Sequence, residues 1–247
     1  MSPPHAPLEK PGVGASFFKP FNSPSFAVKN FYPPLLPGVY YHIFNRGNNR
    51  ETLFYTDENY RYFLGKYIKY LTPVLDTFAY CLLPNHFHLV VRVKSLAEIN
   101  VSVRGTDFPG FKNLESLGLA NRDEDEQVSW LVSHQFRLCF MSYAKALNKQ
   151  RDRTGSLFEK NFKRLAVESA PYFARLILYV HANPQLHGIW DDYRKWPHSS
   201  YLSILSNGAT RLCRETVIEW FGGEDAVIAA HQHYLELKGL DDLTIED

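Results

Sequence analysis

The chain has 247 residues, of which 45% are hydrophobic and 15% aromatic, so it is long enough to bury one substantial core with appendages. Its 27 lysines and arginines nearly balance 26 acidic residues, which excludes a strongly basic protein. No apolar run approaches the roughly 20 residues of a membrane span, and the proline-rich N-terminus does not resemble a secretion signal. We therefore expect a cytoplasmic protein without a membrane partner.

Apolar periodicity and turn residues predict an α+β core. In chain order, we expect a strand at 38–45, a helix at 57–71, strands at 74–82 and 86–93, a helix at 127–150 and a strand at 162–167. This β-α-β-β-α-β order is that of a ferredoxin-like antiparallel sheet with helices on one face. A helix that starts at Pro171 and ends before Pro184 is an addition to that fold.

Three regions lie outside this core pattern. Residues 1–36, rich in proline, serine and phenylalanine, are predicted to form an extended or disordered N-terminal arm. The core domain is expected over 37–202, with a long acidic insertion at about 95–127, and residues 203–247 are expected to form a C-terminal helical extension.

Two histidines, His86 and His88, are separated by one apolar residue in the predicted strand 86–93. Because successive strand side chains point to opposite faces, both imidazoles share one face and Phe87 occupies the other. Such a pair is able to bind a metal or a phosphate. A pair of histidines on an ordinary sheet surface is the alternative, and the strand alone does not decide between the two.

The predicted helix after Pro171 places two more polar groups on one face. At about 3.6 residues per turn, Tyr179 and Asn183 lie one above the other. A phenol, with an ordinary pKa of about 10, is a poor nucleophile at neutral pH, so its attack on a phosphodiester needs a nearby metal. Two imidazoles and an amide oxygen are able to hold that metal with positions left open for phosphate and water.

Five motifs, in this order and spacing, resemble the REP-associated tyrosine transposases of bacteria, which are HUH single-tyrosine transposases of insertion sequences. The resemblance extends from about residue 40 to residue 201. It is carried by Tyr41-His42-Ile43-Phe44-Asn45-Arg46-Gly47, Leu83-Pro84-Asn85-His86-Phe87-His88, Arg153-Thr154-Gly155-Ser156-Leu157-Phe158, the segment from Tyr179 to Gly188, and Trp196-Pro197-His198-Ser199-Ser200-Tyr201.

This resemblance implies a role for each site residue. Tyr179 is the catalytic nucleophile that attacks single-stranded DNA and becomes linked to its 5′ phosphate, while His86, His88 and Asn183 are the ligands of a divalent metal ion, Mg²⁺ or Mn²⁺. The implied activity is a metal-dependent DNA transposase that nicks and joins single-stranded DNA with hairpin or palindromic ends. Members of the family are often dimers, so a homodimer is a second implied partner.

Positive and amide side chains cluster in two places despite the balanced overall charge. One cluster follows the first predicted strand, and the other lies before the Tyr179 helix, where a basic stretch is able to follow a DNA backbone. Turn geometry and an ordinary solvated surface are the alternatives for these residues. The DNA-binding candidates are Asn45, Arg46, Asn48, Arg50, Lys149, Arg153, Lys160, Lys163 and Arg164.

Other functions remain open at this point. A domesticated relative that processes palindromes without moving its own gene has the same residues. A DNA-binding regulator without catalysis is disfavoured by the intact His86, His88 and Tyr179. A zinc hydrolase that acts through metal-bound water needs no tyrosine and would survive the change Tyr179→Phe.

Overall fold

The computed structural model describes residues 31–104, 108–109 and 119–238. The predicted N-terminal arm therefore lies outside the described residues up to residue 30, as do parts of the predicted insertion. Within residues 31–36, which are described, Leu35 is fully buried and its N–H donates a hydrogen bond to the Ser129 hydroxyl at 3.2 Å, whereas Tyr32 is exposed.

A four-stranded sheet organises the described part of the chain. Its strands are β1 (Tyr40–Arg46), β2 (Leu75–Leu83), β3 (His86–Val93) and β4 (Lys163–Ala166). They lie in the order β2-β3-β1-β4, and every neighbouring pair is antiparallel. This is the predicted ferredoxin-like α+β sheet, and that prediction is confirmed.

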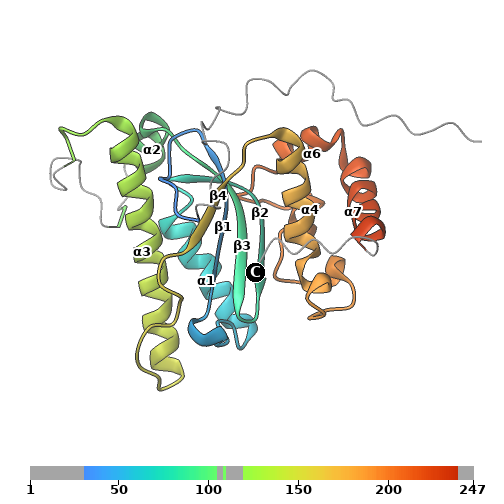
Figure 1. Cartoon of the computed structure of the whole chain (residues 1–247), viewed down its shortest axis with the longest axis horizontal. Helices are drawn as coiled ribbons and strands as arrows, with labels where there is room; N and C mark the ends of the chain where they lie inside the picture. Colours follow the sequence, from blue (N-terminus) through green and yellow to red (C-terminus); the bar gives the residue numbers. More distant parts are fainter. Residues whose placement is uncertain (1–30, 105–107, 110–118, 239–247) are drawn as a thin grey trace, which may run out of the picture.

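Helices cover both faces of this sheet (Figure 1). The helices α1 (Asp57–Tyr70) and α3 (Glu124–Gln150) pack together on one face, as the ferredoxin-like order requires. The opposite face is covered by the additional helix α4 (Ala170–Leu186), which contacts β2 and β3. The sheet therefore has an apolar face toward α1 and α3 and a second face enclosed by α4.

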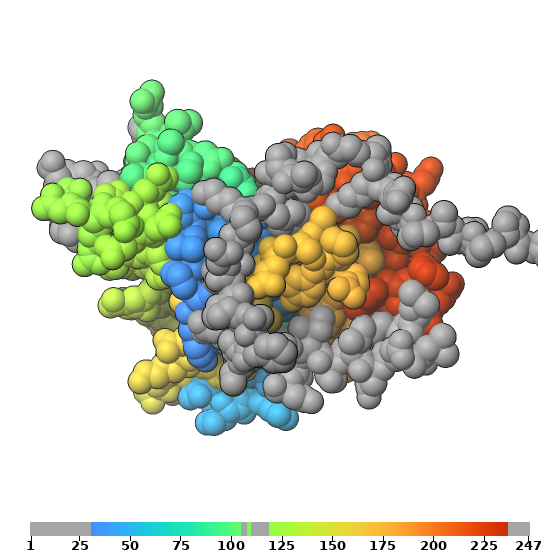
Figure 2. Space-filling view, turned by 45° about the horizontal axis from the view of Figure 1, so that its top comes forward, coloured from blue at the N-terminus to red at the C-terminus, as the bar shows by residue number. Residues whose placement is uncertain are grey.

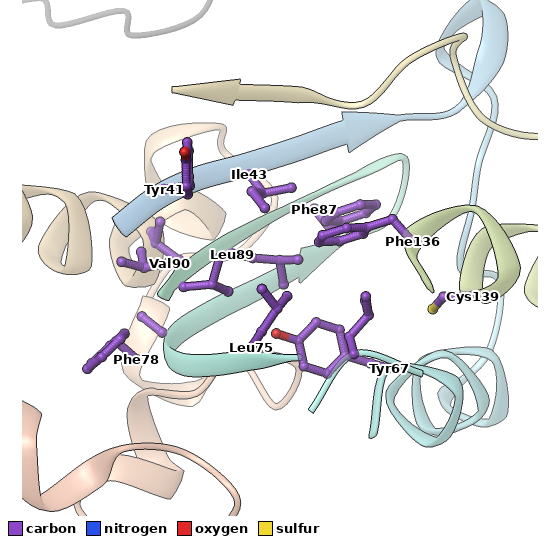
Figure 3. Packing of buried hydrophobic residues seen from close by; sticks show 14 of the residues in the cluster. Tyr41, Ile43, Tyr67, Leu75, Phe78, Phe87, Leu89, Val90, Phe136 and Cys139 are labelled. Carbon is purple, nitrogen blue, oxygen red and sulfur yellow. The ribbon is translucent and has the colours of Figure 1, made fainter. Parts of the chain in front are cut away.

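The main core lies between the sheet and the α1–α3 pair. Alternating strand residues such as Ile43 and Phe87 point into it and are fully buried (Figure 3). Phe87 meets the ring of Phe63 from α1 at 5.4 Å between centroids and that of Phe140 from α3 at 5.7 Å. Because the side chain of Phe87 points into this core, those of its neighbours His86 and His88 point to the opposite face of the sheet, toward α4.

The end of α4 corrects one sequence prediction. The helix continues through Pro184 to Leu186 instead of ending before the proline. Pro184 lies in the last turn, so the missing N–H removes only one hydrogen bond of the helix. The chain still turns directly afterwards, because the Pro184 carbonyl accepts hydrogen bonds from the N–H groups of Ile189 and Trp190.

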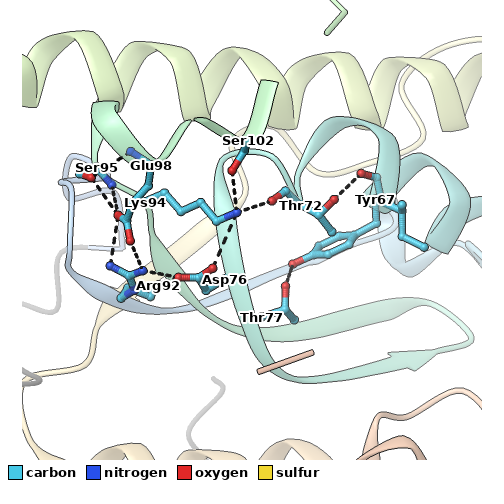
Figure 4. Close-up of polar contacts among 10 residues, drawn as sticks. Tyr67, Thr72, Asp76, Thr77, Arg92, Lys94, Ser95, Glu98 and Ser102 are labelled. Atoms are coloured by element: carbon cyan, nitrogen blue, oxygen red, sulfur yellow. Dashed lines mark hydrogen bonds and ion pairs between the residues drawn. The ribbon is translucent and has the colours of Figure 1, made fainter. Parts of the chain in front are cut away.

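An ion-pair cluster joins β2, β3 and the short helix α2 (Leu96–Val103), as Figure 4 shows. Arg92 of β3 donates to Asp76 of β2 at 2.9 Å through Nε and to Glu98 of α2 at 2.7 Å through Nη2. Ser95 caps α2 in a reciprocal arrangement with Glu98. The start of the predicted insertion is thus a helix fixed to the sheet.

The chain after α4 covers the outer edge of β2. After α5 (Tyr201–Ile204) come α6 (Arg214–Phe221) and α7 (Glu224–Lys238), which lie beyond α4 (Figures 1 and 2). The segment before α6 bonds to β2: Leu82 N–H donates to His198 O, and Cys213 N–H donates to Thr77 O. No helix in the described ranges has the length and apolar character needed to cross a bilayer.

A chain of buried hydrogen bonds fixes α7 to α4. His231 Nδ1 bonds to the Val227 carbonyl at 2.7 Å and therefore donates. Its Nε2 then accepts from His181 Nδ1 at 2.8 Å, and His181 Nε2 accepts from the Ser200 hydroxyl at 2.7 Å. All three side chains are almost completely buried, and the Ser200 hydroxyl also lies 3.2 Å from the Tyr80 carbonyl oxygen, a second acceptor for its proton.

Candidate metal and nucleophile site

The α4 face of the sheet carries a cluster of imidazole rings. His86 and His88 from β3 have ring centroids 5.2 Å apart. His42 from β1 joins them, because the antiparallel register places His42 diagonally across from His88. Its Nε2 lies 3.0 Å from Nδ1 of His88, and both rings are fully buried.

The proton on His86 has a defined position. Its Nδ1 lies 2.7 Å from Oδ1 of Asn85, and a carbonyl oxygen only accepts. Nδ1 therefore carries the proton and donates, so Nε2 has a free lone pair. That Nε2 is buried and makes no hydrogen bond within the described part of the chain.

Burial keeps these rings neutral. Burial, together with His187 and Arg46, lowers the pKa of His86 to about 3, although the neighbouring Asn183 side chain acts in the opposite direction. Burial alone lowers the pKa of His42 to about 3, and burial with the surrounding histidines lowers the pKa of His88. Neutral imidazoles are the form that binds metals.

Helix α4 delivers the other two predicted site residues to this cluster. The Tyr179 ring lies 5.7 Å from the His88 ring and 6.2 Å from the His42 ring, each measured between centroids and in an edge-on arrangement. One turn later, Asn183 is fully buried, and its Nδ2 donates to the Tyr179 carbonyl at 3.4 Å. All four residues named by the sequence for metal and nucleophile are thus brought together.

The donor atoms fit a divalent ion. Among the described residues, no three His, Cys, Asp or Glu side chains are arranged to hold a metal, so a divalent ion between His86 and His88 would need a ligand of another type, such as the Asn183 amide oxygen. Oδ1 of Asn183, like Nε2 of His86, is buried without a hydrogen bond among the described residues. A buried acceptor without a donor is costly, and a cation beside these two atoms would relieve that cost.

A basic groove of about 700 Å³ borders the cluster at His86. Arg46, Arg50 and Lys163 line it, as do the rings of Phe31 and Phe44. Lys163 Nζ lies 5.4 Å and 5.8 Å from the centroids of those two rings. Cations beside aromatic rings are typical of surfaces that bind single-stranded nucleic acid. The cations contact the phosphates, and the bases stack on the rings.

The end of β1 and the loop after it position two of these cations, Arg46 and Arg50. Gly47 allows this loop to close, because a Cβ there would lie 2.0 Å from the Glu51 carbonyl oxygen. Asn49 and Arg50 both have a positive φ, at 52° and 61°, a conformation that asparagine tolerates better than most residues. The loop sequence is therefore explained by backbone geometry and by the presentation of Arg46 and Arg50.

The remaining DNA-binding candidates lie outside this groove. Arg153 pairs with Glu51, and Arg164 donates to the Pro33 carbonyl at 2.5 Å, so both have structural partners. Asn45 and Lys160 border a second cavity, of about 650 Å³, beside α3. Two candidates are exposed elsewhere, namely Asn48 in the 3-10 turn Asn48–Arg50 and Lys149 near the end of α3.

Sequence reasoning gave no site role to two histidines that border the cluster. The alternation of side chains along β1 places His42 on the same face as Phe44. Its approach to His88, however, depends on how β1 is paired with β3. The ring of His187 lies 5.2 Å from that of His86 and lines the groove. It reaches this place because α4 continues past Pro184.

No family model and no curated protein matches the chain. Among solved structures, the chain is similar to a REP-associated tyrosine transposase bound to a REP hairpin. The sequence identity is 15%, the match covers 75% of this chain and 88% of that chain, and the TM-score is 0.44.

Proposed function

We propose that the protein is a metal-dependent transposase that nicks and joins single-stranded DNA with hairpin or palindromic ends. The observation that carries this proposal is the meeting of Tyr179 with His88, beside the open donor atoms of His86 and Asn183. A phenol beside a cation site and a basic groove suits phosphoryl transfer better than it suits a binding surface alone.

The groove side chains would bind the DNA. Arg46, Arg50 and Lys163 contact backbone phosphates, and the rings of Phe31 and Phe44 offer surfaces on which bases stack. His86, His88 and Asn183 would hold Mg²⁺ or Mn²⁺, which when bound polarises the scissile phosphate and offsets its developing charge. Imidazole ligands favour manganese over magnesium on chemical grounds.

Tyr179 supplies the covalent step. Its oxygen forms a bond to phosphorus while the bond between phosphorus and the 3′ oxygen breaks, and the phenolic proton is passed to that 3′ oxygen. The products are a 5′-phosphotyrosine and a free 3′ hydroxyl. Since the ester retains the bond energy, a second 3′ hydroxyl can displace the tyrosine and rejoin the strand without a nucleotide cofactor.

This reaction requires Tyr179 to become accessible. Tyr179 is only 4% exposed, and it is absent from the residues that line the groove. Attack on a phosphate in the groove therefore needs a movement of α4 or of the Tyr179 side chain when DNA binds. A shift of this kind is a conformational step that precedes chemistry.

A covalent-adduct assay tests the proposal. The purified protein is incubated with Mn²⁺ and labelled single-stranded hairpin DNA from the regions that flank its gene, and the products are separated on a denaturing gel. We expect a protein–DNA band that Tyr179→Phe abolishes. Tyr172→Phe, a tyrosine of the same helix, is the matched control and should keep the band.

The other outcomes identify the alternatives. Cleavage that persists in Tyr179→Phe without a covalent band would replace this proposal with a metal-water hydrolase. Binding of several hairpins without any cleavage would support a non-catalytic DNA-binding regulator. Activity on dispersed palindromes but not on the flanks of the gene would indicate a domesticated relative.

A further inference from the structure

The hydrogen bond between His42 and His88 differs from the bond that His86 makes to Asn85. His86 donates to an oxygen that only accepts, so its protonation is settled. In the His42–His88 pair, two ring nitrogens face each other at 3.0 Å, and either one is able to carry the proton. The far nitrogen of His42, Nδ1, is buried and makes no hydrogen bond among the described residues.

Two arrangements of a neutral pair are possible, and they differ at the metal site. If His42 donates from Nε2, then His88 accepts at Nδ1 and carries its own proton on Nε2, which blocks coordination. If His88 donates from Nδ1, then His88 Nε2 has a lone pair, and His42 carries its proton on the buried Nδ1. Only the second arrangement allows His88 to be a ligand.

We propose that His42 is a positioning residue of the metal site, which accepts the Nδ1 proton of His88 and so turns the Nε2 lone pair of His88 toward the ion. The inference rests on the metal site of the proposed function. His42 would then act on His88 as Asn85 acts on His86, through an acceptor bonded to the ligand's other nitrogen.

The surroundings make His42 difficult to replace in this role. Both rings are fully buried, they are nearly parallel at 24°, and the Tyr179 ring closes the same space from α4. Water has little access to serve as a substitute acceptor. The second arrangement places a proton on the buried Nδ1 of His42, which has no acceptor among the described residues and therefore has a cost, and coordination of a metal by His88 Nε2 would favour this arrangement over the first.

Metal binding by matched variants tests this inference. His42→Leu fills part of the volume without an acceptor, whereas His42→Gln returns an oxygen near the position of Nε2. We expect His42→Leu to weaken Mn²⁺ binding by about 10- to 100-fold in calorimetry, and His42→Gln to remain close to the wild type. Thermal unfolding without metal shows whether each variant is folded.

Nitrogen NMR on the wild type gives a second readout that needs no substitution. In the Mg²⁺-loaded protein, ¹⁵N spectra should show the proton bonded to His88 Nδ1, with a coupling across the hydrogen bond to His42 Nε2. A proton bonded to His42 Nε2 in the loaded protein overturns the inference, even if His42→Leu does not fold. So does a folded His42→Leu variant with wild-type Mn²⁺ affinity.

The experiments distinguish a failure of the proposed function from a failure of the proposed role of His42. A wild type that binds neither Mg²⁺ nor Mn²⁺ overturns the metal-dependent function together with this inference. A wild type that binds metal and forms the tyrosine adduct, but whose affinity does not depend on His42, overturns only this inference.

Discussion

The side chain of Asn183 is the amide member of the candidate metal site, and a single substitution gives it a negative charge. Asn183→Asp places a carboxylate of nearly the same shape beside His86, in a fully buried position. Without metal, an unpaired buried charge should reduce stability by on the order of 2–3 kcal/mol. With Mn²⁺, the same charge is a stronger ligand than the amide.

We therefore expect the melting temperature of Asn183→Asp to lie below that of the wild type without metal and to rise more steeply with added Mn²⁺. Asn183→Leu, which removes the ligand oxygen but keeps a similar volume, is the control and should lose most of the Mn²⁺ response. Equal responses of the three proteins in differential scanning fluorimetry would remove Asn183 from the metal site.

The hydroxyl of Ser200 makes hydrogen bonds with two buried groups. It accepts from the Tyr80 N–H at 2.8 Å and contacts His181 Nε2 at 2.7 Å. Ser200→Ala leaves both groups without this partner, so we expect a loss of about 1–3 kcal/mol in the free energy of unfolding, measured by urea denaturation. Ser206→Ala, at an exposed serine, should cost little.

At the scale of elements, the contact between α2 and the sheet depends on pH. Burial raises the pKa of Glu98, but hydrogen bonds from Arg92 and Ser95 outweigh it and hold that pKa at about 2. Because the folded-state pKa lies below the ordinary value of 4.5, the carboxylate contributes stability that is present above pH 4.5. That contribution is lost as the pH falls toward 2.

Glu98→Gln should therefore flatten the loss of stability between pH 4.5 and pH 2, as followed by urea midpoints at several pH values. The effect is modest, because the Glu98 side chain is 43% exposed. Glu126→Gln, at an exposed residue in the first turn of α3, should leave the slope unchanged. A slope that Glu98→Gln does not alter would contradict the assigned role of this carboxylate.

The elements themselves are largely predictable from sequence. The strand expected at 86–93 is found at His86–Val93, because apolar alternation and the turn at Pro84-Asn85 are both local signals. The end of α4 is not predictable in this way. Proline usually marks a helix boundary, but tertiary packing retains Pro184 as a buried residue inside the last turn.

The site is predictable only where it depends on periodicity. Spacing alone places His86 with His88 and Tyr179 with Asn183, since strand and helix repeats are fixed. The contact of His42 with His88 depends on the pairing of β1 with β3, in which His42 lies opposite Val90. The register depends on both strands together, so the sequence of either strand alone does not predict it.

At the scale of the whole molecule, charge is distributed unevenly despite a net charge of +1. Arg46, Arg50 and Lys163 lie together in the groove, whereas Lys149 is near the end of α3. If single-stranded DNA occupies the groove, each cation that contacts a phosphate contributes about 0.7 to the slope of log affinity against log salt.

Lys163→Ala and Arg50→Ala should therefore each reduce this slope by about 0.7, measured by fluorescence anisotropy with a labelled hairpin over a range of salt concentrations. Lys149→Ala is the matched control and is expected to retain the wild-type slope. A reduced slope in Lys149→Ala, with none in the groove variants, would place the DNA on a different surface.

The covering of the sheet edges also limits how copies of this protein are able to associate. Bonds from β2 to residues 198–213 occupy one edge of the sheet, and at the other edge the Arg164 N–H of the four-residue strand β4 donates to the Phe31 carbonyl. Strand-to-strand addition needs a row of open backbone groups. A homodimer in which the two sheets join edge to edge is therefore disfavoured. A dimer interface would instead be formed by helix surfaces or loops.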